Sequence, residues 1–299
     1  MNKHQHCNIC HGTKFTNINK YQHAHLVQCC NCSFVFAQLI PDAATLSKHY
    51  AFYPLSETPP PLTIKRFEEI LQSFRPFNKT NNLIDIGCGD GHFLAIAQQK
   101  GWNIFGTEME KNALRVSNRL GATMCVGDVD FSLAPKNSFD VVTCFEYIEH
   151  VSDPLAEAKK MFDLLRPGGI CYITTPNFSS LSGWLSGKNW NIVEFPEHLS
   201  YFTPRTIKLL YKKAGLLPHQ VTTSGISISR IKESNSNAPR KEHTATIEPL
   251  KYHELRQEDE VLRNKIENNL ALNLLKRTIN GSLNLFSIGD SLKAYFIKP

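Results

Sequence analysis

The stretch LIDIGCGDGHF at residues 83–93 sets the fold. A short apolar run leads into three glycines spaced by two, and a segment with helical apolar periodicity follows. This order predicts a strand, a tight turn and a helix. Glycines permit positive φ and a close approach of the backbone to a ligand, while the helix offers free N–H groups at its N-terminus. The stretch therefore predicts a ligand-binding turn at the end of a buried strand.

Two common phosphate-binding loops do not match this spacing. A dinucleotide-binding turn has the form G-x-G-x-x-G, and His92 stands where its third glycine would be. A Walker A loop ends in Gly-Lys-Ser or Gly-Lys-Thr, which the stretch lacks. The form that remains is D-x-G-x-G-x-G, running from Asp85 to Gly91.

This remaining form resembles motif I of the class I S-adenosylmethionine (SAM) methyltransferases. The resemblance implies that Gly87, Gly89 and Gly91 accommodate the methionine part of SAM. It also implies that Asp85 helps to hold the amino group of SAM through hydrogen bonds.

The next segments carry candidate contacts to a nucleoside. Residues 103–108 predict a second strand that ends in Glu108, where an acid in nucleotide-binding sheets accepts hydrogen bonds from ribose hydroxyls. Glu110 is an alternative ribose ligand, and a solvated carboxylate is the alternative role for Glu108. The resemblance further implies that Asp128 contacts the adenine amino group and that the Val129 N–H contacts the ring.

Strands that alternate with helices predict an α/β protein with a mostly parallel sheet and ligands at its carboxyl edge. The resemblance implies the class I methyltransferase-type sheet of seven strands with helices on both faces, and the cysteine spacing described below adds a small N-terminal zinc ribbon. The expected strands lie at residues 83–86, 103–108, 123–126, 139–144 and 170–177, with a sixth ending at 223 and an antiparallel edge strand at 292–297.

Composition limits the class of protein. No apolar run approaches the roughly 20 residues that span a bilayer, and the polar N-terminus shows no secretory signal. We therefore expect a cytoplasmic protein without a membrane span. Its nine cysteines should be reduced thiols, used for metal binding or core packing. The formal net charge of +6 permits an anionic acceptor without demanding nucleic acid.

Two Cys-x-x-Cys pairs predict a zinc site near the N-terminus. Cys7 and Cys10 form the first pair, and Cys29 and Cys32 form the second. Four thiolates complete a tetrahedral Zn²⁺ shell that has no open position, so the metal should stabilise the fold rather than catalyse. Cys30 could replace Cys29, but only Cys29 keeps the two-residue spacing.

Ionisable residues follow the predicted fourth strand. If the turn is helical, Glu146, Glu149 and His150 share one face and could hold a divalent cation such as Mg²⁺. The segment resembles the Glu-x-x-Glu-His segment of the ubiquinone-pathway O-methyltransferases and the small-RNA 2′-O-methyltransferases, where these residues are metal ligands. In related enzymes without this metal, Glu146 would face the SAM or acceptor pocket and His150 would be a capping or packing residue.

A second group of ionisable residues lies in the loop at residues 194–204. His198 is the candidate general base, with Glu197 or Tyr201 as orienting neighbours. A fourth metal ligand and a structural histidine are the alternative roles for His198. Thr203 is a predicted N-cap for the helix that follows.

The combined pattern resembles the zinc-ribbon sugar methyltransferases of deoxysugar and surface-polysaccharide pathways. The resemblance implies a small-molecule acceptor, most readily an anionic nucleotide sugar or glycan, whose pocket is lined by Tyr50, Tyr53 and the Glu-His loop. Two departures leave O-methylation open beside C-methylation. Phe195 replaces a tyrosine that is common in the C-methylating members, and the long C-terminal domain of those members is absent.

Three prolines at residues 59–61 predict a stiff linker at a domain boundary. We expect a zinc ribbon and acceptor-side segment over residues 1–58 and a SAM-dependent methyltransferase domain over residues 59–299. The core of that domain is expected at residues 80–222, with a C-terminal helix and the edge strand at residues 250–299.

The C-terminal part carries less information. Residues 234–243 are polar and predict a loop, and residues 252–275 carry helical periodicity. The sequence leaves open whether this helix covers the acceptor pocket or packs a homodimer.

Two other functional classes remain as alternatives. An RNA methyltransferase, with metal-assisted 2′-O-methylation, could use the ribbon to bind nucleic acid, but residues 7–36 contain few basic residues, namely Lys14 and Lys20. A non-enzymatic SAM-binding scaffold is opposed by the intact Asp85, the glycine turn and Glu108.

Overall fold

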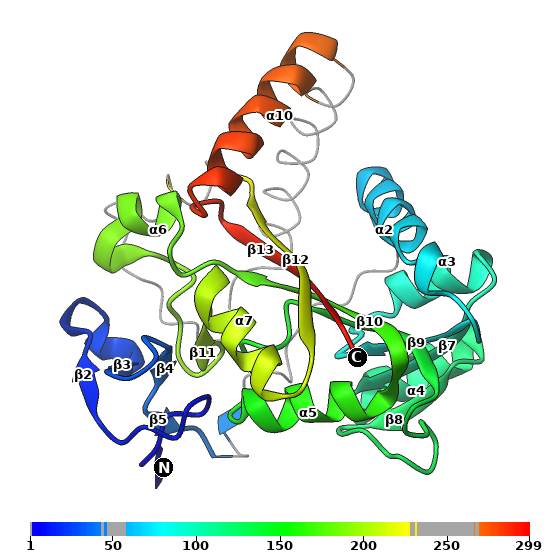
Figure 1. The fold of residues 1–299 in the computed structure, drawn as a ribbon, viewed down its shortest axis with the longest axis horizontal. Helices are drawn as coiled ribbons and strands as arrows, with labels where there is room; N and C mark the ends of the chain where they lie inside the picture. Colours follow the sequence, from blue (N-terminus) through cyan, green and yellow to red (C-terminus); the bar gives the residue numbers. More distant parts are fainter. Residues whose placement is uncertain (1, 43–44, 47–57, 228–230, 232–265, 267–268) are drawn as a thin grey trace. The chain divides into compact units, whose positions relative to one another are not determined.

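The computed structural model describes residues 2–42, 45–46, 58–227, 231, 266 and 269–299 (Figure 1). The chain forms two compact units. The first unit comprises Met1–Leu55, Pro176–Thr203 and Thr223–Ser291, and the second comprises Ser56–Thr175, Pro204–Thr222 and Leu292–Pro299. This grouping differs from the predicted division at residue 58, because two later segments of the chain fold with the N-terminal one. Tyr50 and Tyr53 lie outside the described residues.

The second unit is built on a mostly parallel sheet of seven strands, as predicted. The order of its strands is β12-β13-β10-β9-β6-β7-β8. The pairs β6/β7, β7/β8, β6/β9 and β9/β10 are parallel. The strands are β6 (Asn82–Ile86), β7 (Asn103–Glu108), β8 (Thr123–Val126), β9 (Phe139–Phe145), β10 (Leu165–Pro176), β12 (Leu217–Ser224) and β13 (Ser291–Ile297).

The last strand is not at the edge, so that prediction is wrong. β13 lies between β12 and β10, and β12 forms the edge of the sheet. Leu292, Ala294 and Phe296 alternate along β13 and are buried, so one face of this strand packs against the core. Sheet order depends on pairing between segments far apart in the chain, and strand periodicity alone does not report it.

Helices cover both faces of this sheet (Figure 1). One core cluster includes side chains of α2, α3 and α4, whereas α5 packs against α7 and β9. The helices are α2 (Pro61–Ser73), α3 (His92–Gln99), α4 (Glu110–Leu120), α5 (Pro154–Leu164) and α7 (Pro204–Lys213), with a 3₁₀ turn η2 (Arg75–Phe77).

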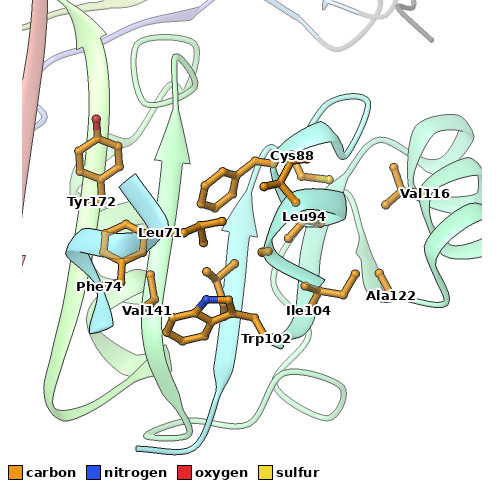
Figure 2. Close-up of a cluster of buried hydrophobic side chains, with 14 of the residues drawn as sticks. Leu71, Phe74, Cys88, Leu94, Trp102, Ile104, Val116, Ala122, Val141 and Tyr172 are labelled. Atoms are coloured by element: carbon orange, nitrogen blue, oxygen red, sulfur yellow. The ribbon is translucent and has the colours of Figure 1, made fainter. Parts of the chain in front are cut away.

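Figure 2 shows the core cluster that fixes the central strands. Leu71 and Phe74, at the end of α2, and Leu94 of α3 lie in one buried cluster with Val141 of β9 and Tyr172 of β10. Full burial of such a side chain stabilises the fold by about 1.5–3 kcal/mol. This cluster therefore holds the strands whose carboxyl ends carry the glycine turn.

The first unit contains a small sheet in the order β11-β4-β3-β2 and a separate β1–β5 pair. β11 pairs antiparallel with β4, so a segment from the second half of the chain completes the N-terminal ribbon. The elements are β1 (Asn2–Lys3), β2 (Phe15–Asn17), η1 (Asn19–Ala24), β3 (Leu26–Cys29), β4 (Val35–Ala37), β5 (Leu39–Ile40), α6 (Leu181–Ser186), η3 (Gly187–Asn189), β11 (Ser200–Tyr201) and α10 (Leu270–Leu285).

The C-terminal helix differs from its predicted span. The predicted loop at 234–243 and the predicted helical residues 252–265 lie outside the described residues. In the described part, α10 begins after Asn269, whose side chain accepts a hydrogen bond from the Leu272 N–H at 3.1 Å, and continues to Leu285. Among the described residues, no helix is long and apolar enough to cross a bilayer.

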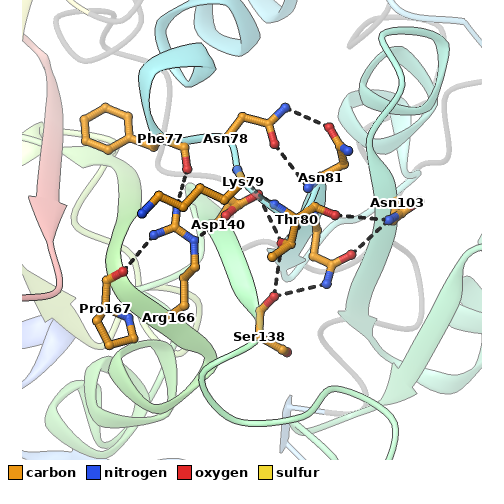
Figure 3. A network of polar contacts seen from close by, with 11 residues as sticks. Phe77, Asn78, Lys79, Thr80, Asn81, Asn103, Ser138, Asp140, Arg166 and Pro167 are labelled. Atoms are coloured by element: carbon orange, nitrogen blue, oxygen red, sulfur yellow. Dashed lines mark hydrogen bonds and ion pairs between the residues drawn. The ribbon is translucent and has the colours of Figure 1, made fainter.

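A buried ion pair stabilises the amino end of the main sheet (Figure 3). The Arg166 Nε donates to the Asp140 Oδ1 at 2.5 Å, and the Asp140 side chain is fully buried. The N–H groups of Lys79 and Thr80 donate to Asp140 Oδ2. Burial acts to raise the pKa of Asp140, but these donors outweigh it, so that pKa is lowered overall. The pair therefore joins the chain before β6 to β9 and β10.

Removing Arg166 should destabilise the protein strongly. In Arg166→Met the Asp140 carboxylate loses its buried partner, and we expect the free energy of unfolding to fall by about 3 kcal/mol or more. Lys136→Met is the matched control, because it breaks the exposed pair with Asp163 and should cost less than about 1 kcal/mol. Urea unfolding curves measure both changes, and equal losses in the two variants would contradict the assignment.

Candidate functional site

The glycine turn joins β6 to α3 with left-handed backbone at each glycine. Gly87, Gly89 and Gly91 have φ values of 70°, 54° and 67°. A Cβ atom on Gly87 would lie 2.3 Å from Cδ2 of Tyr147, and one on Gly91 would lie 2.9 Å from Val116. Both backbone conformation and close packing therefore require glycine at these two positions. No sequence signal identified Tyr147, which packs directly over the first glycine.

The Glu108 carboxylate contacts the turn, as expected from parallel strands that end at the same edge. The Gly89 N–H donates to Glu108 Oε2 at 2.9 Å, and the Met109 N–H donates to Oε1 at 2.9 Å. Each carboxylate oxygen can still accept a further hydrogen bond. The arrangement can therefore bind a diol beside the glycine turn. The alternative, Glu110, is exposed in the first turn of α4.

Asp85 is a buried acid directly before the turn. Its side chain is almost fully buried, and the Thr143 hydroxyl donates to Oδ1 at 2.7 Å. Burial raises the pKa of Asp85 to about 7, with a smaller contribution from the nearby Glu108 charge. A cationic group bound beside Asp85 would favour its ionised form.

The predicted adenine contacts lie after β8 and have a partner that the sequence did not reveal. The Asp128 Oδ1 accepts hydrogen bonds from Lys160 Nζ at 2.5 Å and from the Val129 N–H at 2.6 Å. Lys160 also pairs with the buried Glu157 at 3.1 Å. The same Asp128 oxygen thus contacts both Lys160 and the backbone N–H of Val129.

Helix α4 also holds the turn through a contact that the sequence analysis missed. The Arg115 Nη2 donates to Asp90 Oδ1 at 2.6 Å, and Arg119 donates to the carbonyl oxygen of Asp90. Asp90 is the residue between the second and third glycines. The turn is therefore supported from outside by two guanidinium groups.

The predicted shared face of Glu146, Glu149 and His150 does not form. Glu146 has a φ of 46° and is exposed, so an α-helix does not pass through this turn. Glu149 is buried, and its Oε2 accepts a hydrogen bond from the Thr175 hydroxyl at 2.9 Å. Among the described residues, Glu146 belongs to no cluster with metal-ligand spacing. Glu146 therefore does not share a helical face with Glu149 and His150, while divalent-cation binding by these two residues stays a prediction.

The loop at residues 194–204 fixes the orientation of the His198 ring through one of its nitrogens. The His198 Nδ1 lies 2.7 Å from the Ile192 carbonyl oxygen, which can only accept, so Nδ1 carries the proton. Nε2 then carries the lone pair of the neutral ring. The Tyr201 hydroxyl is buried and donates to the His198 carbonyl oxygen at 3.0 Å. Tyr201 thus contacts the backbone of His198, while Glu197 is half-buried beside it in the chain.

The four predicted cysteines converge in the first unit. The Sγ atoms of Cys7, Cys10, Cys29 and Cys32 lie within 4.8 Å of one another. The Cys7–Cys32 and Cys10–Cys29 sulfur distances are 3.6 Å and 3.5 Å, close to the roughly 3.8 Å between thiolates around one Zn²⁺. Cys30 is exposed and outside the cluster. The ligand set and its spacing therefore fit a zinc ion.

The two Cys-x-x-Cys turns have the same backbone design. The Cys7 carbonyl accepts from the His11 N–H, and the Cys29 carbonyl accepts from the Ser33 N–H, each at 2.9 Å. His11 and Ser33 both have positive φ values, 59° and 66°. Each tight turn therefore directs its two thiol groups toward the centre of the four-cysteine cluster.

Comparisons with known proteins agree with this fold. A family model described as "Methyltransferase domain" matches residues 61–221, slightly more than half of the chain. The ubiquinone biosynthesis O-methyltransferase of Idiomarina loihiensis is 32% identical over 131 residues, which cover 41% of this chain and 51% of that protein. The enzyme of the same name from Dinoroseobacter shibae is 31% identical over 161 residues, covering 50% and 64%.

These relatives differ from the expected sugar methyltransferases. The matched parts span between half and two thirds of the curated relatives' lengths. A SAM-dependent methyltransferase from Archaeoglobus fulgidus superposes with a TM-score of 0.50 at 15% identity, covering 86% of this chain and all of that one. This likeness supports the fold alone.

Zinc content should depend on Cys29 and not on Cys30. We expect about one zinc per chain in protein purified with reductant. Cys29→Ser should lose the metal because it removes a ligand, whereas the neighbouring Cys30→Ser should retain it. Elemental analysis measures the ratio, and zinc-free wild-type protein or loss in both variants would contradict the site.

Asp85→Asn should change stability in a pH-dependent way. Between the unfolded pKa near 4 and the folded pKa of about 7, the native state binds one more proton than the unfolded state. Raising the pH through this window therefore lowers the free energy of unfolding of the wild type. The amide introduced by Asp85→Asn cannot ionise, so the variant should gain up to about 4 kcal/mol over the wild type at pH 8 and little at pH 4. Chemical unfolding at both pH values tests this, and a pH-independent difference would refute it.

Proposed function

Because the chain belongs to the methyltransferase-domain family, we propose that it transfers a methyl group from SAM to a small-molecule acceptor. One observation carries this proposal. The Glu108 carboxylate is held at the Gly89 N–H, close enough to the buried Asp85 for the two charges to interact. The acid can accept hydrogen bonds from the ribose diol of SAM, the glycine turn leaves room for its methionine part, and the buried acid can pair with its amino group.

The residues of the second unit divide the binding of SAM among them. Glu108 accepts hydrogen bonds from the ribose hydroxyls of SAM. Asp85 accepts a hydrogen bond from the amino group of SAM. Asp128 and the Val129 N–H bind adenine, with Lys160 keeping the Asp128 carboxylate in place. SAM supplies a methyl group that is activated by its bond to a sulfonium.

The acceptor chemistry is assigned to the loop at residues 194–204. His198 Nε2 takes the proton from an acceptor hydroxyl, because Nδ1 is committed to the Ile192 carbonyl oxygen. The hydroxyl oxygen forms the new bond to carbon while the carbon–sulfur bond breaks with its electron pair on sulfur. Tyr201 holds the His198 backbone, and Glu197 orients the ring.

Glu146 completes the proposed acceptor side. Its left-handed backbone at the end of β9 is sparsely populated by non-glycine residues, and such conformations concentrate at functional sites. The Glu146 N–H donates to the Thr174 carbonyl oxygen at 3.0 Å, which holds this conformation. We assign Glu146 to acceptor orientation and no longer to Mg²⁺ binding.

A nucleotide sugar or glycan is the acceptor that the sequence pattern supports. The zinc-type ribbon and the Glu-His loop are features of the sugar methyltransferases that the sequence resembles. A second candidate is an O-methylation acceptor in ubiquinone biosynthesis, favoured by the names of the curated relatives. The ubiquinone-pathway acceptor implies transfer to a hydroxyl, whereas the sugar acceptor is compatible with O- or C-methylation.

Transfer of a radiolabelled methyl group distinguishes the two acceptors. Purified protein and labelled SAM are incubated with a cell extract, which is then separated into nucleotide-sugar, glycan, lipid, RNA and protein fractions. Label in the first two supports the sugar acceptor, and label in the lipid fraction supports the ubiquinone-pathway acceptor. Label in RNA or protein, or SAM binding that cannot be detected by calorimetry, contradicts the proposal.

Glu108→Ala should weaken SAM binding, whereas Glu110→Ala should not. Loss of two charge-assisted hydrogen bonds to ribose should raise the Kd for SAM by about 100-fold. Glu110 is the matched control, since it is an exposed glutamate two residues away. Isothermal titration calorimetry measures the Kd for SAM in both variants. A larger rise in Kd for Glu110→Ala would make Glu110 the ribose ligand in place of Glu108.

His198→Gln should slow methyl transfer without affecting SAM affinity. General-base catalysis contributes about 10²–10⁴-fold to rate, so kcat should fall by at least about 10²-fold. His219→Gln is the control, because His219 is an exposed histidine on β12. Unchanged kcat in the His198 variant would exclude it as the base.

A further inference from the structure

Helix α10 contacts its own unit through two asparagines and a leucine. The Asn280 and Asn284 side-chain oxygens accept hydrogen bonds from the N–H groups of Gly225 and Thr223, each at 2.9 Å. Leu283, between these asparagines, is buried. One side of α10 is therefore fixed to the unit, mainly by polar contacts.

The opposite side of α10 is apolar and exposed. At 100° per residue, the apolar side chains fall within about half a turn of the helix, facing away from Asn280 and Asn284. Leu270 is 88% exposed and Leu285 is 78% exposed. The members of this apolar face are Leu270, Leu274, Leu275, Ile279, Leu285 and Phe286.

An ordinary surface helix turns most of its apolar side chains to the core, whereas α10 buries Leu283 and leaves the apolar face exposed. Contiguous exposed apolar patches mark surfaces that bind a partner or a membrane. The apolar face of α10 therefore needs an occupant.

The charges on α10 indicate what that occupant is. Residues 270–285 contain Lys276 and Arg277 and no acidic residue. Arg277 is exposed, and the chain as a whole carries a formal net charge of +6. A second copy of α10 would bring like charges together without a carboxylate to pair them. An anionic lipid surface offers both an apolar interior and negative headgroups.

An exposed tryptophan lies in a helix tied to the end of α10. The Leu181 N–H, at the start of α6, donates to the Ile288 carbonyl oxygen at 2.8 Å, and the Ser182 hydroxyl donates to the Asp290 carboxylate. Trp184 of α6 is 76% exposed. Tryptophan is the residue type enriched where a protein meets the lipid headgroups.

We propose that the apolar face of α10, together with Trp184, docks the protein onto an anionic lipid bilayer. The helix lies in the plane of the membrane interface, with its leucines in the acyl boundary and Arg277 among the headgroups. This docking surface is separate from the candidate methyl-transfer residues. The inference goes beyond the proposed function and does not depend on it.

Vesicle flotation with the full-length protein tests the docking surface. Wild-type protein should float with phosphatidylcholine vesicles that contain phosphatidylglycerol. Leu270→Ser/Leu274→Ser should lower the partition coefficient at least about tenfold, because two leucines no longer bury in lipid. Leu114→Ser on α4 is the matched control, an exposed helical leucine outside the apolar face. It should float like the wild type.

A charge variant separates the two parts of the interaction. Arg277→Gln should lower binding to the anionic vesicles about fivefold and leave binding to pure phosphatidylcholine unchanged. All substituted side chains are exposed, so the unfolding temperatures should match the wild type and report folded protein.

Three outcomes would overturn the proposal. The first is no flotation of the wild type with anionic vesicles. The second is equal flotation of the double leucine variant and the wild type. The third is a wild-type dimer in analytical ultracentrifugation that the double variant dissociates, which would assign the face to a second copy of the chain.

Discussion

The parallel pairing of β6 with β7 is the constraint that creates the candidate cofactor site. Their register places Ile86 beside Thr107, so both strands end at the same edge of the sheet. Glu108 then reaches the Gly89 N–H only because the turn stays close to the strand end. That closeness requires a glycine beneath the Tyr147 ring, where a Cβ atom would clash at 2.3 Å. A single side chain at Gly87 would thus displace both the turn and the acid that faces it.

Two buried acids at opposite ends of the same sheet have pKa values that are shifted in opposite directions. At its amino end, Asp140 is surrounded by donors, and its pKa is lowered. At its carboxyl end, burial dominates, and the pKa of Asp85 is raised to about 7. The first arrangement stabilises the fold, because the charge is compensated within the protein. The second leaves a charge that a bound cation would compensate, which is the usual way in which a binding site differs from a structural one.

In the first unit, the cysteine cluster and the candidate base belong to one small sheet. β11 follows His198 directly and pairs with β4, and β3, the neighbour of β4, ends at Cys29. The Tyr201 hydroxyl then fixes the His198 carbonyl oxygen. A metal that orders the two knuckles therefore also supports the loop that carries His198. The ribbon would then act on the loop through structure alone, because a site of four thiolates has no open position for chemistry.

Features that are encoded within short segments could be predicted from the amino-acid sequence. The glycine turn, the strand that ends at Glu108 and the two cysteine knuckles belong to this group, because each depends on residues only a few positions apart. Which distant segments meet became known only from the folded chain. The fold placed Tyr147 over Gly87, Lys160 on Asp128 and β13 inside the sheet, and it separated Glu146 from Glu149 through a left-handed backbone. Periodicity reports which side of a segment is buried, but it carries no information about the partner that buries it.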